Sequence, residues 1–86
     1  MGSVLQVPYG ALVTVDPESA TPLYAQLANL LRARIASGEI TSRLPSLKTI
    51  SQQYEVSHIT AEHAVTLLRD EGLVETVIGR GTFVKR

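Results

Sequence analysis

The sequence lacks cysteine and tryptophan, and its aromatic residues are three tyrosines and one phenylalanine. Without cysteine, disulfide bonds, thiolate metal sites and cysteine nucleophiles are excluded, so stability must come from packing. There is no apolar run of about 18 residues that would cross a membrane, and the first residues lack the charged start of a signal peptide. We therefore expect a soluble, cytoplasmic protein.

Net charge is also missing, because eight basic residues balance eight acidic ones. No overall positive field would draw nucleic acid from a distance, and this total taken alone argues against DNA binding. The charges are unevenly placed, however. Acids gather at Asp16, Glu18, Glu39, Asp70, Glu71 and Glu75, largely away from Lys48, His58, Arg80 and Lys85. We expect a polarised domain whose non-specific binding to DNA is weak.

With 86 residues, 44% hydrophobic and 19% charged, the chain has the composition of one folded domain. Residues 1–21 are expected to form an N-terminal extended segment, with short extended pieces at 4–15 and a loop before Thr21. Thr21 is predicted to cap an amphipathic helix over 22–37, with Pro22 at its first position. Gly38 would end that helix in the left-handed conformation.

Two further helices and a hairpin are predicted over the rest of the domain, 22–86. Ser46 and Ser57 are expected to cap helices that run to about Tyr54 and to 70. Two β-rich runs, 73–78 and 82–86, surround Gly79-Arg80-Gly81 and indicate a hairpin. Leu73, Val77, Phe83 and Val84 would close the core, and Tyr24 and Tyr54 would cover the contact between the first two helices.

This order of elements predicts an α+β, mainly α fold, the winged helix-turn-helix. The third helix buries a stripe of Ala61, Ala64, Val65 and Leu68. Its opposite face then carries His58, Ile59, Glu62, His63, Thr66 and Arg69.

Short fragments recur in a fixed order over about 60 residues of the chain. They are Pro22-Leu23-Tyr24-Ala25-Gln26-Leu27, Leu31-Arg32, Ser37-Gly38-Glu39-Ile40, Leu44-Pro45-Ser46, Val56-Ser57, Thr60, Glu71-Gly72-Leu73-Val74 and Gly79-Arg80-Gly81-Thr82-Phe83-Val84. In their order and spacing these fragments resemble the DNA-binding domain of the GntR family of bacterial transcription regulators.

The resemblance implies a sequence-specific DNA-binding transcription regulator, a repressor by type. Helix 57–70 would enter the major groove and the wing tip at 79–81 the neighbouring minor groove, usually in dimers on a palindromic double-stranded operator. Base-reading candidates are His58, Ile59, Thr60, Glu62 and His63. Candidates for phosphate or minor-groove contacts are Arg43, Ser46, Lys48, Ser57, Gly79, Arg80, Gly81 and Lys85.

Two positions depart from the family, since the sites commonly occupied by arginine are His58 and Glu62 here. A carboxylate in a groove repels phosphates and accepts only from a base that offers a donor, such as the cytosine amino group. Glu62 would therefore lower the affinity for DNA and raise the selectivity among base sequences. The plainer alternative is that His58, Glu62 and His63 are merely solvated and that Arg80 is an ordinary loop arginine.

No cofactor, metal site or enzyme activity is expected. His58 and His63 are five residues apart, which does not bring them side by side on a helix, and no serine has an oriented base. The alternative function is a winged-helix protein-interaction module with little DNA binding, suggested by the zero net charge. The 86 residues leave no room for an effector pocket, which fits either an excised N-terminal domain or a small stand-alone regulator. We expect a monomer or weak homodimer that has no membrane contact.

Overall fold

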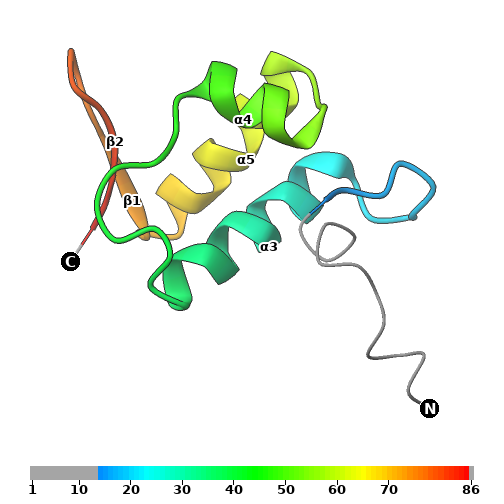
Figure 1. Cartoon of the computed structure of the whole chain (residues 1–86), viewed down its shortest axis with the longest axis horizontal. Helices are drawn as coiled ribbons and strands as arrows, with labels where there is room; N and C mark the ends of the chain where they lie inside the picture. Colours follow the sequence, from blue (N-terminus) through cyan, green and yellow to red (C-terminus); the bar gives the residue numbers. More distant parts are fainter. Residues whose placement is uncertain (1–13, 86) are drawn as a thin grey trace.

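A computed structural model describes residues 14–85 of the chain (Figure 1). Three helices come first: α3 (Leu23–Ala36), α4 (Leu47–Tyr54) and α5 (His58–Asp70). The strands β1 (Val74–Val77) and β2 (Gly81–Val84) then pair antiparallel. Together with the turn at 78–80 they form what we call the wing. The predicted winged helix-turn-helix is confirmed.

Most helix ends lie where the sequence predicted them. The Ser46 hydroxyl accepts a hydrogen bond from the backbone N–H of Thr49 at 3.1 Å, and that of Ser57 accepts one from Thr60 at 3.0 Å. Each bond satisfies an amide that the helix itself leaves unpaired. After α3, Gly38 adopts a φ of 88°, the left-handed conformation expected of a residue that ends a helix.

The start of α3 differs from the prediction. Pro22 is the N-cap rather than the first helical residue, its ψ of 147° is extended, and no side chain caps the helix. The predicted Thr21 cap is therefore wrong. Gln26 reaches back instead: its side-chain amide donates to the carbonyl oxygens of Asp16 and Thr21 and accepts from the N–H of Asp16. A side chain one turn inside the helix thus holds the incoming loop.

The core lies between α3 and the pair α4 and α5 and is closed by β1. Its largest fully buried side chains are Leu27, Leu31, Ile50, Leu68 and Val74. The stripe predicted on the third helix, Ala61, Ala64, Val65 and Leu68, is buried throughout. The two alanines allow α3 to pack closely against α5, because small side chains keep the backbones near each other.

The wing closes the core through a different valine from the one predicted. Val74 is 1% exposed, whereas Val77, expected in the core, is 37% exposed. Alternate strand residues point to opposite faces, so the residue at one end of this four-residue strand cannot share a face with the residue at the other end. Leu73 and Val84 pack against the core as expected, and Phe83 is half-buried.

The connector between α3 and α4 pairs with β2 along the edge of that strand that faces away from β1. Leu44 donates its N–H to the carbonyl of Thr82 at 2.9 Å, and Val84 donates to that of Ser42 at 2.6 Å. Arg43 forms an isolated antiparallel bridge with Phe83 between these two bonds. The connector therefore ties the wing to the start of α4.

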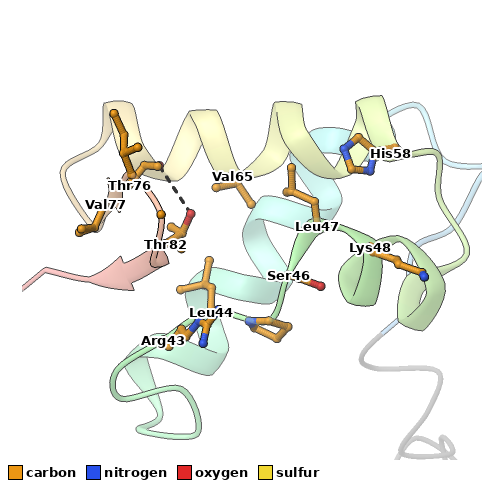
Figure 2. Close-up of a pocket in the computed structure, with 14 residues that line it drawn as sticks. Arg43, Leu44, Ser46, Leu47, Lys48, His58, Val65, Thr76, Val77 and Thr82 are labelled. Atoms are coloured by element: carbon orange, nitrogen blue, oxygen red, sulfur yellow. Dashed lines mark hydrogen bonds between the residues drawn. The ribbon is translucent and has the colours of Figure 1, made fainter.

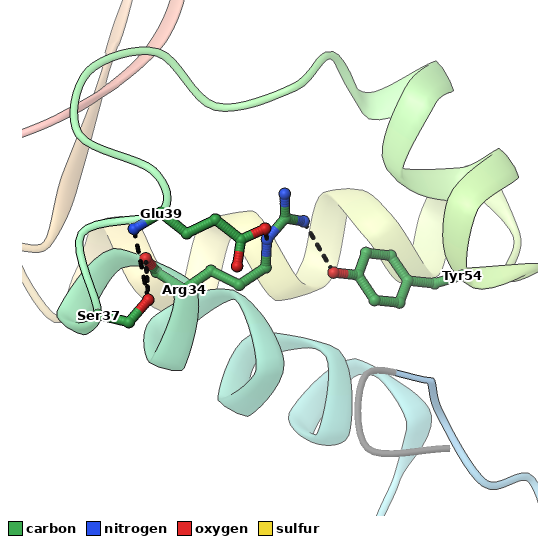
Figure 3. Close-up of polar contacts among 4 residues, drawn as sticks. All are labelled: Arg34, Ser37, Glu39 and Tyr54. Carbon is green, nitrogen blue, oxygen red and sulfur yellow. Dashed lines mark hydrogen bonds and ion pairs between the residues drawn. The ribbon is translucent and has the colours of Figure 1, made fainter. Parts of the chain in front are cut away.

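Tyr54 joins the first two helices as predicted (Figure 3). Its hydroxyl accepts a hydrogen bond from Nη1 of Arg34 at 2.9 Å, and Nε of Arg34 pairs with Oε2 of Glu39 at 3.0 Å. Burial lowers the pKa of the Arg34 guanidinium, but its bonds and attraction to Tyr54 and Glu39 outweigh this and raise its pKa above the usual value. The prediction for Tyr24 is wrong, because Tyr24 stacks on His63 of α5.

The extended pieces predicted at 4–15 lie outside the described residues except for Thr14 and Val15. Val15 packs against the core, and the next residues form a turn in which Ser19 donates its N–H to the carbonyl of Asp16 at 3.1 Å. Within residues 14–85, no helix is both long and apolar enough to span a bilayer.

Candidate nucleic-acid interface

An open groove of about 470 Å³ runs between the helices and the wing (Figure 2). We call it the front groove. Three parts of the chain line it: the connector with the first turn of α4, the exposed side of α5, and the wing. Its lining residues are Arg43, Leu44, Pro45, Ser46, Leu47, Lys48, His58, Val65, Thr76, Val77, Ile78, Gly79, Gly81 and Thr82.

A second hollow of about 210 Å³, which we call the wing cleft, separates α5 from the wing. Its lining residues are Leu47, Glu62, Val65, Thr66, Arg69, Thr76 and Thr82. Leu47, Val65, Thr76 and Thr82 also line the front groove. One side of α5 therefore presents His58, then Glu62, then Thr66 and Arg69 to these two hollows.

The base-reading candidates differ in where they lie on α5. His58, Ile59 and Glu62 are exposed, and His58 and Glu62 line the two hollows. Ile59 is 74% exposed, which leaves its apolar surface open to a partner such as a thymine methyl group. Thr60 is half-buried, and its hydroxyl lies 3.0 Å from that of Ser57, so it serves the helix cap.

His63 lies on a different side of α5. Its ring stacks on that of Tyr24, with 3.8 Å between the ring centroids and 7° between the planes. This places His63 toward the start of α3, and it lines neither hollow. A base-reading role for His63 stays a prediction, which this geometry does not favour.

The candidates for phosphate or minor-groove contacts also divide by position. Five of them line the front groove, namely Arg43, Ser46, Lys48, Gly79 and Gly81. Ser57, Arg80 and Lys85 are exposed without lining it. Among residues 14–85 the ion pairs are Arg32 with Glu71 and Arg34 with Glu39. The charges of Arg43, Lys48, Arg80 and Lys85 therefore stay available to an anionic partner.

The wing tip combines charge with exposed apolar surface. Ile78 is 96% exposed in the turn, directly before Gly79 and Arg80. Gly79 has a φ of 80°, and the N–H of Arg80 donates to the carbonyl of Val77 at 2.9 Å to close the turn. The sequence prediction named the glycines and Arg80 at this tip but missed Ile78, whose exposure depends on the position of the turn.

The sequence prediction placed Arg69, like Thr66, on the exposed face of its helix but assigned it no contact. Its Nη1 donates to the hydroxyl of Thr76 at 2.7 Å and its Nη2 to that of Thr66 at 3.2 Å. Helical spacing alone placed Arg69 on the exposed face of its helix. Its partner on the wing is Thr76, and this contact depends on how the hairpin packs against α5.

The described residues hold no cluster of three or more potential metal ligands. The first turn of α4, the exposed side of α5 and the tip of the wing face one open groove. The basic side chains Arg43 and Lys48 line that groove. That arrangement, on three helices followed by a two-stranded wing, defines the winged helix-turn-helix class.

Residues 23–84 match the family model described as "Bacterial regulatory proteins, gntR family". The chain belongs to this family, and the resemblance inferred from the sequence is confirmed. It is 33% identical over 76 residues to the HTH-type transcriptional repressor NagR of Bacillus subtilis, covering 86% of this chain and 31% of the relative. It is 35% identical over 66 residues to the mannosyl-D-glycerate transport/metabolism system repressor MngR of Escherichia coli, covering 74% and 28%.

Solved structures agree with this assignment. YtrA from Sulfolobus acidocaldarius, a GntR-family transcription factor, superposes with a TM-score of 0.78 at 34% identity, covering 87% of this chain and 81% of that one. AraR(DBD) in complex with operator ORX1 gives 0.77 at 32% identity, covering 86% and 96%. The chain thus spans about 30% of the length of the curated relatives above but most of each of these two structures.

Proposed function

We propose that this domain binds a double-stranded DNA operator and represses transcription there. In the proposed complex, α5 enters the major groove and the wing tip reaches the neighbouring minor groove. A repressor acts on the chromosome, so the proposal places the protein in the bacterial cytoplasm, on the nucleoid when bound. It assigns no catalytic step to the chain.

The observation that carries this proposal is the composition of the front groove. The start of α5, the first turn of α4 and the wing all face it, and Arg43 and Lys48 line it without forming an ion pair within the described residues. Helix N-termini bring unpaired amide groups and positive potential to the same side. A surface of this kind suits a phosphate backbone that lies on either side of an inserted helix. AraR(DBD), of similar fold, is described as a complex with its operators.

The side chains of α5 support sequence reading more than general affinity. His58 can donate to the N7 of guanine, Ile59 can contact a thymine methyl group, and Glu62 can accept from the cytosine amino group. With zero formal charge over the chain, little affinity comes from a general field. We therefore infer that base contacts and paired half-sites supply much of the specific binding.

The proposed operator is palindromic, with one domain on each half-site. In this proposal a single domain places α5 in one major groove and the wing in the adjacent minor groove. A second domain would occupy the other half-site about one helical turn away, as in other helix-turn-helix dimers. The domain alone is expected to be a monomer or weak dimer that pairs on DNA.

Selection of bound DNA from a random pool, followed by fluorescence anisotropy over a salt series, tests the proposal. We expect an enriched palindromic motif and an affinity that falls steeply with salt, with a log-log slope that reflects roughly 3 to 5 phosphate contacts per domain. A scrambled duplex of the same composition is the control. Failure to enrich any motif, together with no complex at any salt concentration, would favour a protein-interaction module instead.

A further inference from the structure

We propose that Arg69 holds the wing against α5 and contacts the phosphate backbone of DNA that passes between them. The inference rests on the proposed function and deepens it. It concerns the wing cleft, and it assigns a role to a residue outside the contacts inferred from the sequence.

A protein that places a helix in the major groove and a hairpin in the adjacent minor groove must straddle the sugar-phosphate strand that separates the two grooves. That strand then lies over the space between helix and hairpin. In this molecule the space is the wing cleft, which is about 210 Å³ in volume and bounded by α5 on one side and the wing on the other.

Of the residues that line the wing cleft, Arg69 carries the positive charge and Glu62 the negative charge. Arg69 forms no ion pair within the described part of the chain, since the two ion pairs found there involve Arg32 and Arg34. Glu62, two turns earlier on α5, would repel a phosphate, and Arg69 supplies the opposite charge at the other end of the cleft.

The guanidinium of Arg69 is bound to two hydroxyls, those of Thr66 on α5 and Thr76 on β1. The Thr76 hydroxyl in turn lies 3.5 Å from that of Thr82 on β2, a contact that Figure 2 shows. These neutral partners fix the side chain without neutralising it. A guanidinium offers five N–H donors, and its bonds to the two threonines use two of them. The others can bind a phosphate, and little side-chain freedom is lost on binding because the arginine is already held in place.

The same bonds make Arg69 a positioning residue for the wing. Its bond of 2.7 Å to Thr76 connects the last turns of α5 to the middle of the hairpin. The wing tip then reaches the minor groove from a defined angle relative to the helix in the major groove. Loss of Arg69 would remove both a phosphate contact and this restraint, whereas loss of the Thr76 hydroxyl would remove the restraint alone.

The test is the salt dependence of binding by Arg69→Ala, Arg69→Lys and Thr76→Val to the selected operator. For Arg69→Ala we expect an affinity loss of about 10-fold, because charge-assisted hydrogen bonds are the strong ones. The log-log salt slope should fall by about 1. Arg69→Lys should keep the slope, and Thr76→Val should weaken binding less with the slope unchanged. The matched control is Arg32→Ala, which removes the same charge from the ion pair between α3 and Glu71 and should alter neither quantity.

Neutral methylphosphonate substitutions along the operator then locate the contact. One phosphate per half-site, between the major-groove and minor-groove contacts, should weaken wild-type binding when neutralised but have no effect on Arg69→Ala. An unchanged slope in Arg69→Ala, or the same phosphate pattern in both proteins, overturns the inference while the proposed function stands. If the wild-type domain binds no DNA at all, the proposed function fails and this inference fails with it. Circular dichroism of each variant checks that it is folded.

Discussion

The side chain of Arg43 lies against the backbone of Gly81, so that a Cβ added at Gly81 would come within 3.0 Å of the arginine Nε. Gly81 also has a φ of 119°, which lies beyond the left-handed region that other residues can visit. The connector before α4 and the start of β2 therefore meet at a residue whose backbone conformation favours glycine. Arg43, whose side chain lies against that residue, also lines the front groove.

Replacing Gly81 with alanine should destabilise the fold by about 1–3 kcal/mol, because the backbone conformation is strained for any residue with a Cβ. It should also displace Arg43 and weaken DNA binding. Urea unfolding and fluorescence anisotropy measure the two effects. Gly79→Ala is the matched control: its φ of 80° is nearer the allowed region and nothing lies within 4 Å of the added Cβ. A Gly81 variant no more impaired than the Gly79 variant would contradict this account.

Ser57→Ala should lower the free energy of unfolding by about 1 kcal/mol, because the variant leaves an amide at the start of α5 without its partner. Ser57→Gly should cost only a few tenths of a kcal/mol, since glycine leaves that amide accessible to water. Thermal unfolding compares the two variants. Equal stability of the alanine variant and the wild type would show that the bond of 3.0 Å to the Thr60 amide does not stabilise the helix.

Several of these features were predictable from sequence because they depend on near neighbours. The Ser46 and Ser57 caps, Gly38 after α3 and the hairpin around Gly79 each follow from residues within one turn. The start of α3 was not predictable in this way, because the side chain of Gln26 bonds back to Asp16 in place of a local cap. The prediction for Val77 failed because Val74, three residues earlier, takes the core face of the strand, and that for Tyr24 failed because its ring stacks on His63 of a distant element.

Tyr54→Phe should destabilise the domain by about 1 kcal/mol, since it leaves Nη1 of the half-buried Arg34 without its acceptor. Glu39→Gln should cost less than about 0.5 kcal/mol, because the glutamate side chain is 50% exposed and its ion pair is screened by water. A double-mutant cycle by urea unfolding measures both and their coupling. A larger loss of stability in Glu39→Gln than in Tyr54→Phe would contradict this prediction, because it would make Glu39 the more important partner of Arg34.

Glu62→Gln should raise affinity for non-specific DNA and relax base choice, because it removes a charge that repels phosphate and adds a donor. Binding-site selection with the variant and the wild type measures the change. Glu55→Gln, which makes the same charge change at the end of α4 outside both hollows, is the control. Identical selected motifs for the Glu62 variant and the wild type would contradict a base-reading role for this carboxylate.

The site itself was only partly predictable. The exposed face of α5 follows from helical spacing, so His58, Ile59 and Glu62 could be found from the sequence. Stacking of His63 on Tyr24 and the bond from Arg69 to Thr76 join elements that the sequence separates. No local pattern marks either contact. The pairing of the connector with β2, which brings Arg43 to the groove, is likewise a result of tertiary packing.

The central claim is that α5 and the wing form one DNA-binding face. Its most direct test is an amide-resolved NMR titration of the domain with its selected operator. The account predicts shifts or broadening at residues 58–66, 43–48 and 78–82, with the solvent side of α3 around Arg32 unaffected. Changes confined to α3 and the loop before it, with α5 and the wing silent, would contradict it.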